Sequence, residues 1–161
     1  IREINGLILK ATTLSKNCYN FLFKYNNVNY AHNLILPATI LTEECYYGMF
    51  ETNYNLKTAP ELPATTLAKG CYRAMFSSCY LLEILPYLPA TTLEQDCYRF
   101  MFNSVQQAKY LKIAYTGNFS STYFNTWVGN LFSSSGDFYY NGTDTTVGVS
   151  AIPTGWTVHT F

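Results

Sequence analysis

Cysteine is the residue of this chain with the most reactive side chain, and four of the five cysteines recur at a regular spacing. Cys18, Cys45, Cys71 and Cys97 follow one another at 27, 26 and 26 residues. Zinc needs ligands that converge tetrahedrally, whereas side chains at equivalent places in successive repeats point the same way, so we predict no metal site. Adjacent thiols could form disulfides if the repeats stack closely. We favour buried free thiols, because cysteine on a buried stripe behaves as a small hydrophobic residue, and we expect the unmatched Cys79 to point inward as well.

A tyrosine follows each of the four spaced cysteines, which gives a second row of equivalent residues: Tyr19, Tyr46, Tyr72 and Tyr98. A row of stacked rings can serve as a platform for sugars or peptides. The row shares the cysteine stripe, which we expect to face inward. Its main role is therefore predicted to be structural.

Candidates for acid–base chemistry are sparse. His32 and His159 are the two histidines, and stacked repeats would hold them far apart. No Ser/His/Asp or Cys/His set can be assembled around either of them. The adjacent Glu43 and Glu44 are expected on a solvated face, and no glycine-rich phosphate loop precedes a helix. The sequence therefore predicts no catalytic residue, no cofactor and no enzymatic activity.

These residues are positioned by a repeat. The segments LKATTLSKNCYNFLF, LPATILTEECYYGMF, LPATTLAKGCYRAMF and LPATTLEQDCYRFMF begin at residues 9, 36, 62 and 88, and seven of their fifteen positions are identical in all four. A period of about 20 to 29 residues with recurrent leucine is typical of leucine-rich solenoids, whose units bury their apolar faces on one another.

Within one unit, two kinds of segment can be distinguished. Apolar residues from Leu67 to Phe76 recur at helical spacing and predict a short amphipathic helix whose start is marked by Pro63 and Thr65. The intervening segments LKTAPEL, at 56–62, and LEILPYL, at 82–88, predict one extended strand in each coil. Stacked at about 4.8 Å, these strands would form a parallel sheet.

The unit L..AP.LPATTLA..CY..MF..C..L resembles the 26-residue subtype of the BspA-like leucine-rich repeats, which occur in surface proteins of mucosal bacteria and in some of their phages. The resemblance covers about residues 1–115, and the tail from Phe124 onward resembles the segment that closes such arrays. It implies an α/β repeat solenoid with one short strand and one short helix in each coil of about 26 residues. The departures are Lys10 in place of proline, one inserted residue between the first two copies, and a link after Phe102 that we expect to be longer by three residues.

Two parts are expected along the chain. Residues 1–115 would form the solenoid, with four copies and a final strand, and we expect it to be incomplete at its N-terminal side and part of a longer polypeptide. Residues 116–161 would form a β-rich cap with hairpins at Asn141-Gly142 and at 153–155. Trp127 and Trp156 are expected to cover the open end of the solenoid as large apolar plugs.

Composition limits the partners. Ten basic and ten acidic residues cancel, so no net charge attracts nucleic acid or anionic lipid, and we predict no nucleic-acid partner. A hydrophobic content of 48% excludes a disordered chain. No apolar run approaches the roughly 18 residues of a membrane-spanning helix, so we predict no membrane insertion within this segment.

The resemblance implies a non-enzymatic recognition or adhesion module on the bacterial cell surface, with a protein or glycan as its partner. The alternative that it leaves open is a structural or receptor-binding component of a phage virion, such as a fibre or decoration domain. The sequence does not identify the ligand.

Residues that differ between copies can determine which partner is bound, and the predicted strands contain several such residues. Alignment places Lys57 level with Glu83, and Lys112 follows if the longer link precedes its strand. These charges could merely pair across strands, or the face could recognise a partner with Tyr87 as the anchor. The candidate partner-binding face comprises Tyr30, His32, Lys57, Glu61, Glu83, Tyr87 and Lys112.

Overall fold

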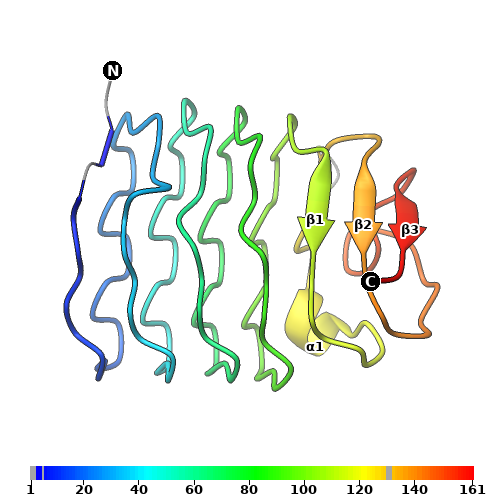
Figure 1. Cartoon of the computed structure of the whole chain (residues 1–161), viewed down its shortest axis with the longest axis horizontal. Coiled ribbons are helices and arrows are strands. Elements are labelled where there is room, and N and C mark those ends of the chain that lie inside the picture. Colours follow the sequence, from blue (N-terminus) through cyan, green and yellow to red (C-terminus); the bar gives the residue numbers. More distant parts are fainter. Residues whose placement is uncertain (1–2, 5, 130–131) are drawn as a thin grey trace.

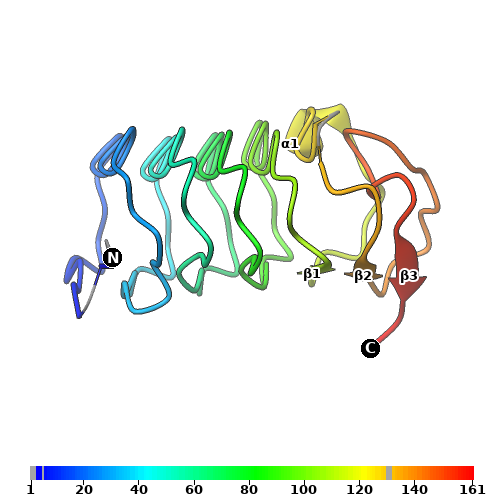
Figure 2. The ribbon, with the colours of Figure 1, turned by 90° about the horizontal axis from the view of Figure 1, so that it is seen from above.

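The computed structural model describes residues 3–4, 6–129 and 132–161. The chain winds into coils that lie side by side, with the N-terminus at one end of the array and the C-terminus near the other (Figures 1 and 2). Parallel backbone bridges join equivalent positions of neighbouring coils, for example Thr58 with Ile84 and Thr66 with Thr92. The spacing of the sequence repeat is thus the spacing of the coils.

Within the described residues, regular strands form only toward the C-terminal end. The described residues contain β1 (Tyr110–Lys112), β2 (Asp137–Tyr139) and β3 (Thr157–His159), which form a parallel sheet in the order β1-β2-β3. In the earlier coils the sheet is reduced to isolated bridges. Proline lacks the N–H that a ladder needs, and proline recurs along this side of the coils at Pro37, Pro60, Pro63, Pro86 and Pro89.

The side of each coil predicted to be an α-helix has a different backbone. Residues 16–25, 43–52, 69–78 and 95–104 form successive turns. Alternate N–H groups bond within the coil, as from Tyr47 to the Glu44 carbonyl at 3.2 Å, and to the next coil, as from Gly48 to the Arg73 carbonyl at 2.8 Å. Every fourth residue has a positive φ, as at Glu44 (54°), Gly48 (56°) and Thr52 (66°).

The helix prediction is therefore wrong for these segments, and the spacing of the coils explains why. The rings of Phe50 and Phe76, which are equivalent residues on this side, lie 5.6 Å apart. Neighbouring α-helices need an interaxial distance of about 8–10 Å. A backbone that bonds to the next coil fits the shorter distance, and the described residues contain one α-helix, α1 (Ser121–Phe124), capped by the Ser120 hydroxyl.

The copied residues form the core. Tyr46, Tyr72 and Tyr98 are 1–2% exposed, and their rings stack at 5.9 and 6.3 Å. A parallel row of phenylalanines stacks beside them, from Phe23 through Phe50 and Phe76 to Phe102. This confirms the structural interpretation of the tyrosine row for its three buried members.

The cysteine prediction is confirmed for four residues and wrong for one. Cys45, Cys71, Cys79 and Cys97 are fully buried, and none of the five cysteines forms a disulfide in the described structure. Cys18 is exposed. Its coil is covered on one side only, because no described coil lies on its N-terminal side.

The predicted hairpins are also absent from the described part of residues 116–161, where β2 and β3 continue the stack in parallel. The Asn141 side chain does not shape a tight turn between antiparallel strands; its amide group donates to the Phe161 carbonyl at 2.7 Å, and its oxygen accepts from the Phe161 N–H at 2.8 Å. Trp127 lies between Phe102 and Phe138, with ring centroids at 6.2 and 6.3 Å, so later residues cover it in turn.

Candidate functional site

Lys57 and Glu83 lie level on adjacent coils, as the alignment predicts. The bridge between Thr58 and Ile84 fixes this register, and the Lys57 Nζ lies 3.9 Å from Glu83 Oε1. Both side chains are exposed, at 41% and 56%. They form a surface ion pair, which contributes little to stability because water screens it.

Lys112 occupies another place than predicted. Leu88 bridges Ile113, which lies 25 residues further along the chain, so the link after Phe102 is shorter by one residue and not longer by three. Lys112 therefore lies beside Tyr87 and does not extend the row of Lys57 and Glu83. Its Nζ is 5.4 Å from the Tyr87 ring centroid and 3.7 Å from that of Phe161.

Tyr30 and His32 lie at the other end of the predicted face. Tyr30 bridges Thr58, and its ring meets that of His32 edge-on at 6.3 Å. His32 Nδ1 is 3.1 Å from the Thr58 hydroxyl, and its Nε2 is 3.9 Å from Glu3 Oε1. Each ring nitrogen of the imidazole thus has a polar neighbour at the surface.

A groove of about 560 Å³ lies on this side of the coils, and we call it the strand-face groove. Its lining includes four of the variable outward residues and four prolines: His32, Glu61, Ile84, Tyr87, Pro60, Pro63, Pro86 and Pro89. A second hollow of about 260 Å³ shares His32, Glu61 and Pro63 with it. The face therefore brings four of the seven candidate residues, Tyr30, His32, Glu61 and Tyr87, close to one depression, with three of them in its wall.

The groove is mostly apolar. Ile84 and Tyr87 are 62% and 46% exposed, and Glu61 is the one carboxylate in the lining. Among the described residues Glu61 has neither an ion pair nor a hydrogen bond. Sequence reasoning used the prolines only to mark where the predicted strands and helices begin or end, and so missed that they build the wall; their recurrence beside the variable positions was the available signal.

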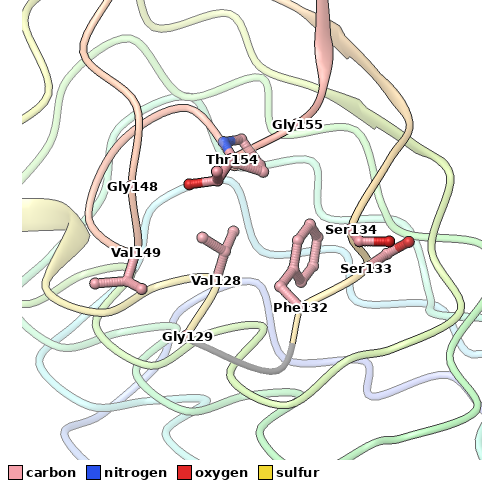
Figure 3. A pocket seen from close by; sticks show the side chains of 10 residues that line it. Val128, Gly129, Phe132, Ser133, Ser134, Gly148, Val149, Thr154 and Gly155 are labelled. Carbon is pink, nitrogen blue, oxygen red and sulfur yellow. The ribbon is translucent and has the colours of Figure 1, made fainter.

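A further hollow of about 320 Å³ lies near the C-terminal end. Figure 3 shows Val128, Phe132 and Thr154 around it, and its ten lining residues include no acidic, basic, histidine or cysteine side chain. This lining offers no group for acid–base chemistry.

The histidine in β3 has a partner that the sequence did not suggest. His159 Nε2 lies 2.6 Å from Asp137 Oδ1, and the imidazole stacks on Tyr139 at 4.8 Å. The parallel pairing of β2 with β3 creates this contact, whereas the predicted hairpin would have arranged these strands differently. Within the part of the chain that the structure describes, no hydroxyl or thiol forms a hydrogen bond with His159.

The buried thiols have weak nucleophilic character at neutral pH. Burial raises the pKa of Cys45 to about 11 and that of Cys97 to about 12. The thiolate is the reactive form, so these residues are inert in the folded chain.

Glu43, which the sequence placed on a solvated face, pairs with Lys16 at 2.9 Å and with Lys69 at 4.0 Å.

Comparison of the chain with protein-family models, with curated proteins and with solved structures finds no match. The BspA-like resemblance and the leucine-rich-repeat class therefore stay predictions that rest on the repeat motif. In the described ranges, no helix has the length and apolar character needed to cross a membrane.

Proposed function

We propose that this chain is a non-enzymatic recognition module of a bacterial surface protein, which binds a protein or glycan partner through the strand-face groove. The observation that carries the proposal is the groove itself, an open and mostly apolar depression whose wall holds residues that vary between copies. The resemblance to surface proteins supports the location.

The different burial of copied and variable residues supports this proposal. Copied residues such as Leu62, Leu88 and Phe76 are at most 3% exposed. Glu61 and Tyr87 occupy one matched position in neighbouring units, differ in chemistry and are both exposed. Substitution at such positions changes the surface offered to a partner without disturbing the core.

The backbone beneath the groove is well fixed. The Ala59 N–H donates to the Ile84 carbonyl at 3.0 Å, and the Leu88 N–H donates to the Lys112 carbonyl at 3.0 Å. A preformed surface loses little conformational entropy when it binds. This favours recognition by a rigid face.

Arrays of synthetic peptides and of glycans, probed with the fluorescently labelled chain, test the proposal. Tyr87→Ala should weaken binding to the ligands that the native chain selects by roughly 10-fold or more, because exposed aromatic anchors contribute much of the contact energy. Tyr54→Ala is the matched control, since Tyr54 is 48% exposed and lies outside the groove. Equal binding by the native chain and Tyr87→Ala, or an equal loss in both variants, contradicts the proposal.

A further inference from the structure

Among the described residues, the Glu61 carboxylate has no partner, and it lies in a mostly apolar groove lining. The other charged side chains of the candidate face have partners: Lys57 pairs with Glu83, and Lys112 lies over the Tyr87 ring. Glu61 has none among the described residues, although it lies in the wall of the groove. A carboxylate beside apolar surface is most favourably matched by a cation that also brings apolar atoms.

Tyr87 is 46% exposed and lines the groove together with Glu61. Lys112 comes from the coil after Tyr87, whereas Glu61 belongs to the coil before it. The groove lining includes Glu61 and Tyr87 but not Lys112. A ligand in the groove therefore meets the carboxylate and the tyrosine together, and the lysine does not block it.

We infer that the strand-face groove binds an arginine side chain of an extended peptide segment, an inference that rests on the proposed function. The planar guanidinium donates a fork of hydrogen bonds that matches the Glu61 carboxylate, and it stacks on aromatic rings such as Tyr87. The methylene stem of the arginine lies along Ile84 and the prolines. A groove of about 560 Å³ is within the usual range for a ligand of this size.

A neutral glycan satisfies this site less completely. Its hydroxyl groups can donate to Glu61, but they cannot neutralise the charge. The charge complementarity therefore favours a basic peptide over a sugar as the partner.

An NMR titration of the full ¹⁵N-labelled chain tests the inference with two matched probes. The first is acetyl-Ala-Ala-Arg-Ala-Ala-amide, and the second replaces arginine with citrulline, which has nearly the same shape and no charge. The arginine peptide should shift the amide signals of Glu61 and Tyr87 saturably. The citrulline peptide should bind roughly 3- to 10-fold more weakly, because it lacks the charge that pairs with the exposed Glu61 carboxylate.

Two substitutions test whether the Glu61 carboxylate is the group that recognises the arginine. Glu61→Gln should abolish the preference for arginine over citrulline. Glu83→Gln should preserve it, because Glu83 is also an exposed strand-face carboxylate but does not line the groove. The amide spectrum of each variant reports directly whether it is folded.

Equal affinity for the two peptides, no shift at Glu61 and Tyr87, or an equal effect of Glu61→Gln and Glu83→Gln overturns the inference. If triacetylchitotriose shifts the groove amides while the arginine peptide does not, the cation inference fails and the proposed function stands. If Tyr87→Ala also leaves the array binding unchanged, both fail.

Discussion

The phenylalanine row gives the sharpest prediction about what holds the coils together. Phe76 is fully buried and stacks between Phe50 at 5.6 Å and Phe102 at 5.8 Å, with interplanar angles of 10° and 5°. Phe23 occupies the same position of an earlier copy, but it is only partly buried and has one ring neighbour in the row, Phe50 at 5.3 Å. The two residues form a matched pair.

Phe76→Ala should lower the free energy of unfolding by about 4 to 5 kcal/mol. Replacement of a buried phenylalanine with alanine costs about 3 to 5 kcal/mol through lost burial and the remaining cavity. Two aromatic contacts, each contributing about 0.5 to 1.5 kcal/mol, place Phe76 in the upper part of that range. Phe23→Ala should cost about 2 kcal/mol, because less surface and one contact are lost.

Urea unfolding measures both values, followed by circular dichroism and by intrinsic fluorescence so that coincident transitions establish a single cooperative step. A loss of less than about 1 kcal/mol for Phe76→Ala would mean that the ring is not enclosed. A loss no larger than that of Phe23→Ala would likewise refute the stacked core.

Three more predictions follow from the backbone and from the buried thiols. Ala74 has a φ of 49°, so Ala74→Gly should leave the free energy of unfolding in urea unchanged or raise it by up to about 1 kcal/mol. In an α-helix, the same change would lower it by about 1 kcal/mol. A thiol reagent at pH 8 should modify Cys18 quickly and the other four cysteines only after denaturation, and rapid modification of several native thiols would contradict their burial. Stability should also decline above about pH 9: the folded-state pKa values of Cys45, about 11, and Cys97, about 12, exceed the ordinary 9.0, so the unfolded chain releases these protons first. Each thiol's contribution is complete below pH 9 and falls by about 1.4 kcal/mol per pH unit up to its folded-state pKa, and a flat profile of urea midpoints from pH 8 to 11 would refute this.

The sequence predicted which residues face inward better than it predicted the backbone that carries them. Cys71, Tyr72, Met75 and Phe76 are all at most 2% exposed, as their recurrence indicated. Their spacing matches one face of a helix, but spacing describes side chains and says nothing of hydrogen bonds between coils. Those bonds, such as that from the Tyr72 N–H to the Cys97 carbonyl at 3.1 Å, determine the conformation.

Local sequence patterns also could not predict the register in which distant segments of the chain pair. The Asn141-Gly142 pair is typical of a hairpin turn, but the side chain of Asn141 bonds to Phe161 and the strands run in parallel. The length of the link before Lys112 could not be read from a segment that has little similarity to the other copies. The bridge from Leu88 to Ile113 fixes it and places Lys112 against Tyr87.

The candidate face was predicted in part. Sequence alignment paired Lys57 with Glu83 and matched Glu61 with Tyr87, because these residues sit at the same distance from copied neighbours. The depression between Glu61 and Tyr87 depends on how the prolines pack, which residue spacing does not reveal.

A crystal structure of the chain bound to the tightest ligand from the peptide and glycan arrays would locate the binding site. Our prediction is that the ligand lies in the strand-face groove, in contact with both Glu61 and Tyr87. A ligand bound instead on the turn segments at 43–52 and 69–78, or in the C-terminal hollow beside Phe132, would contradict it.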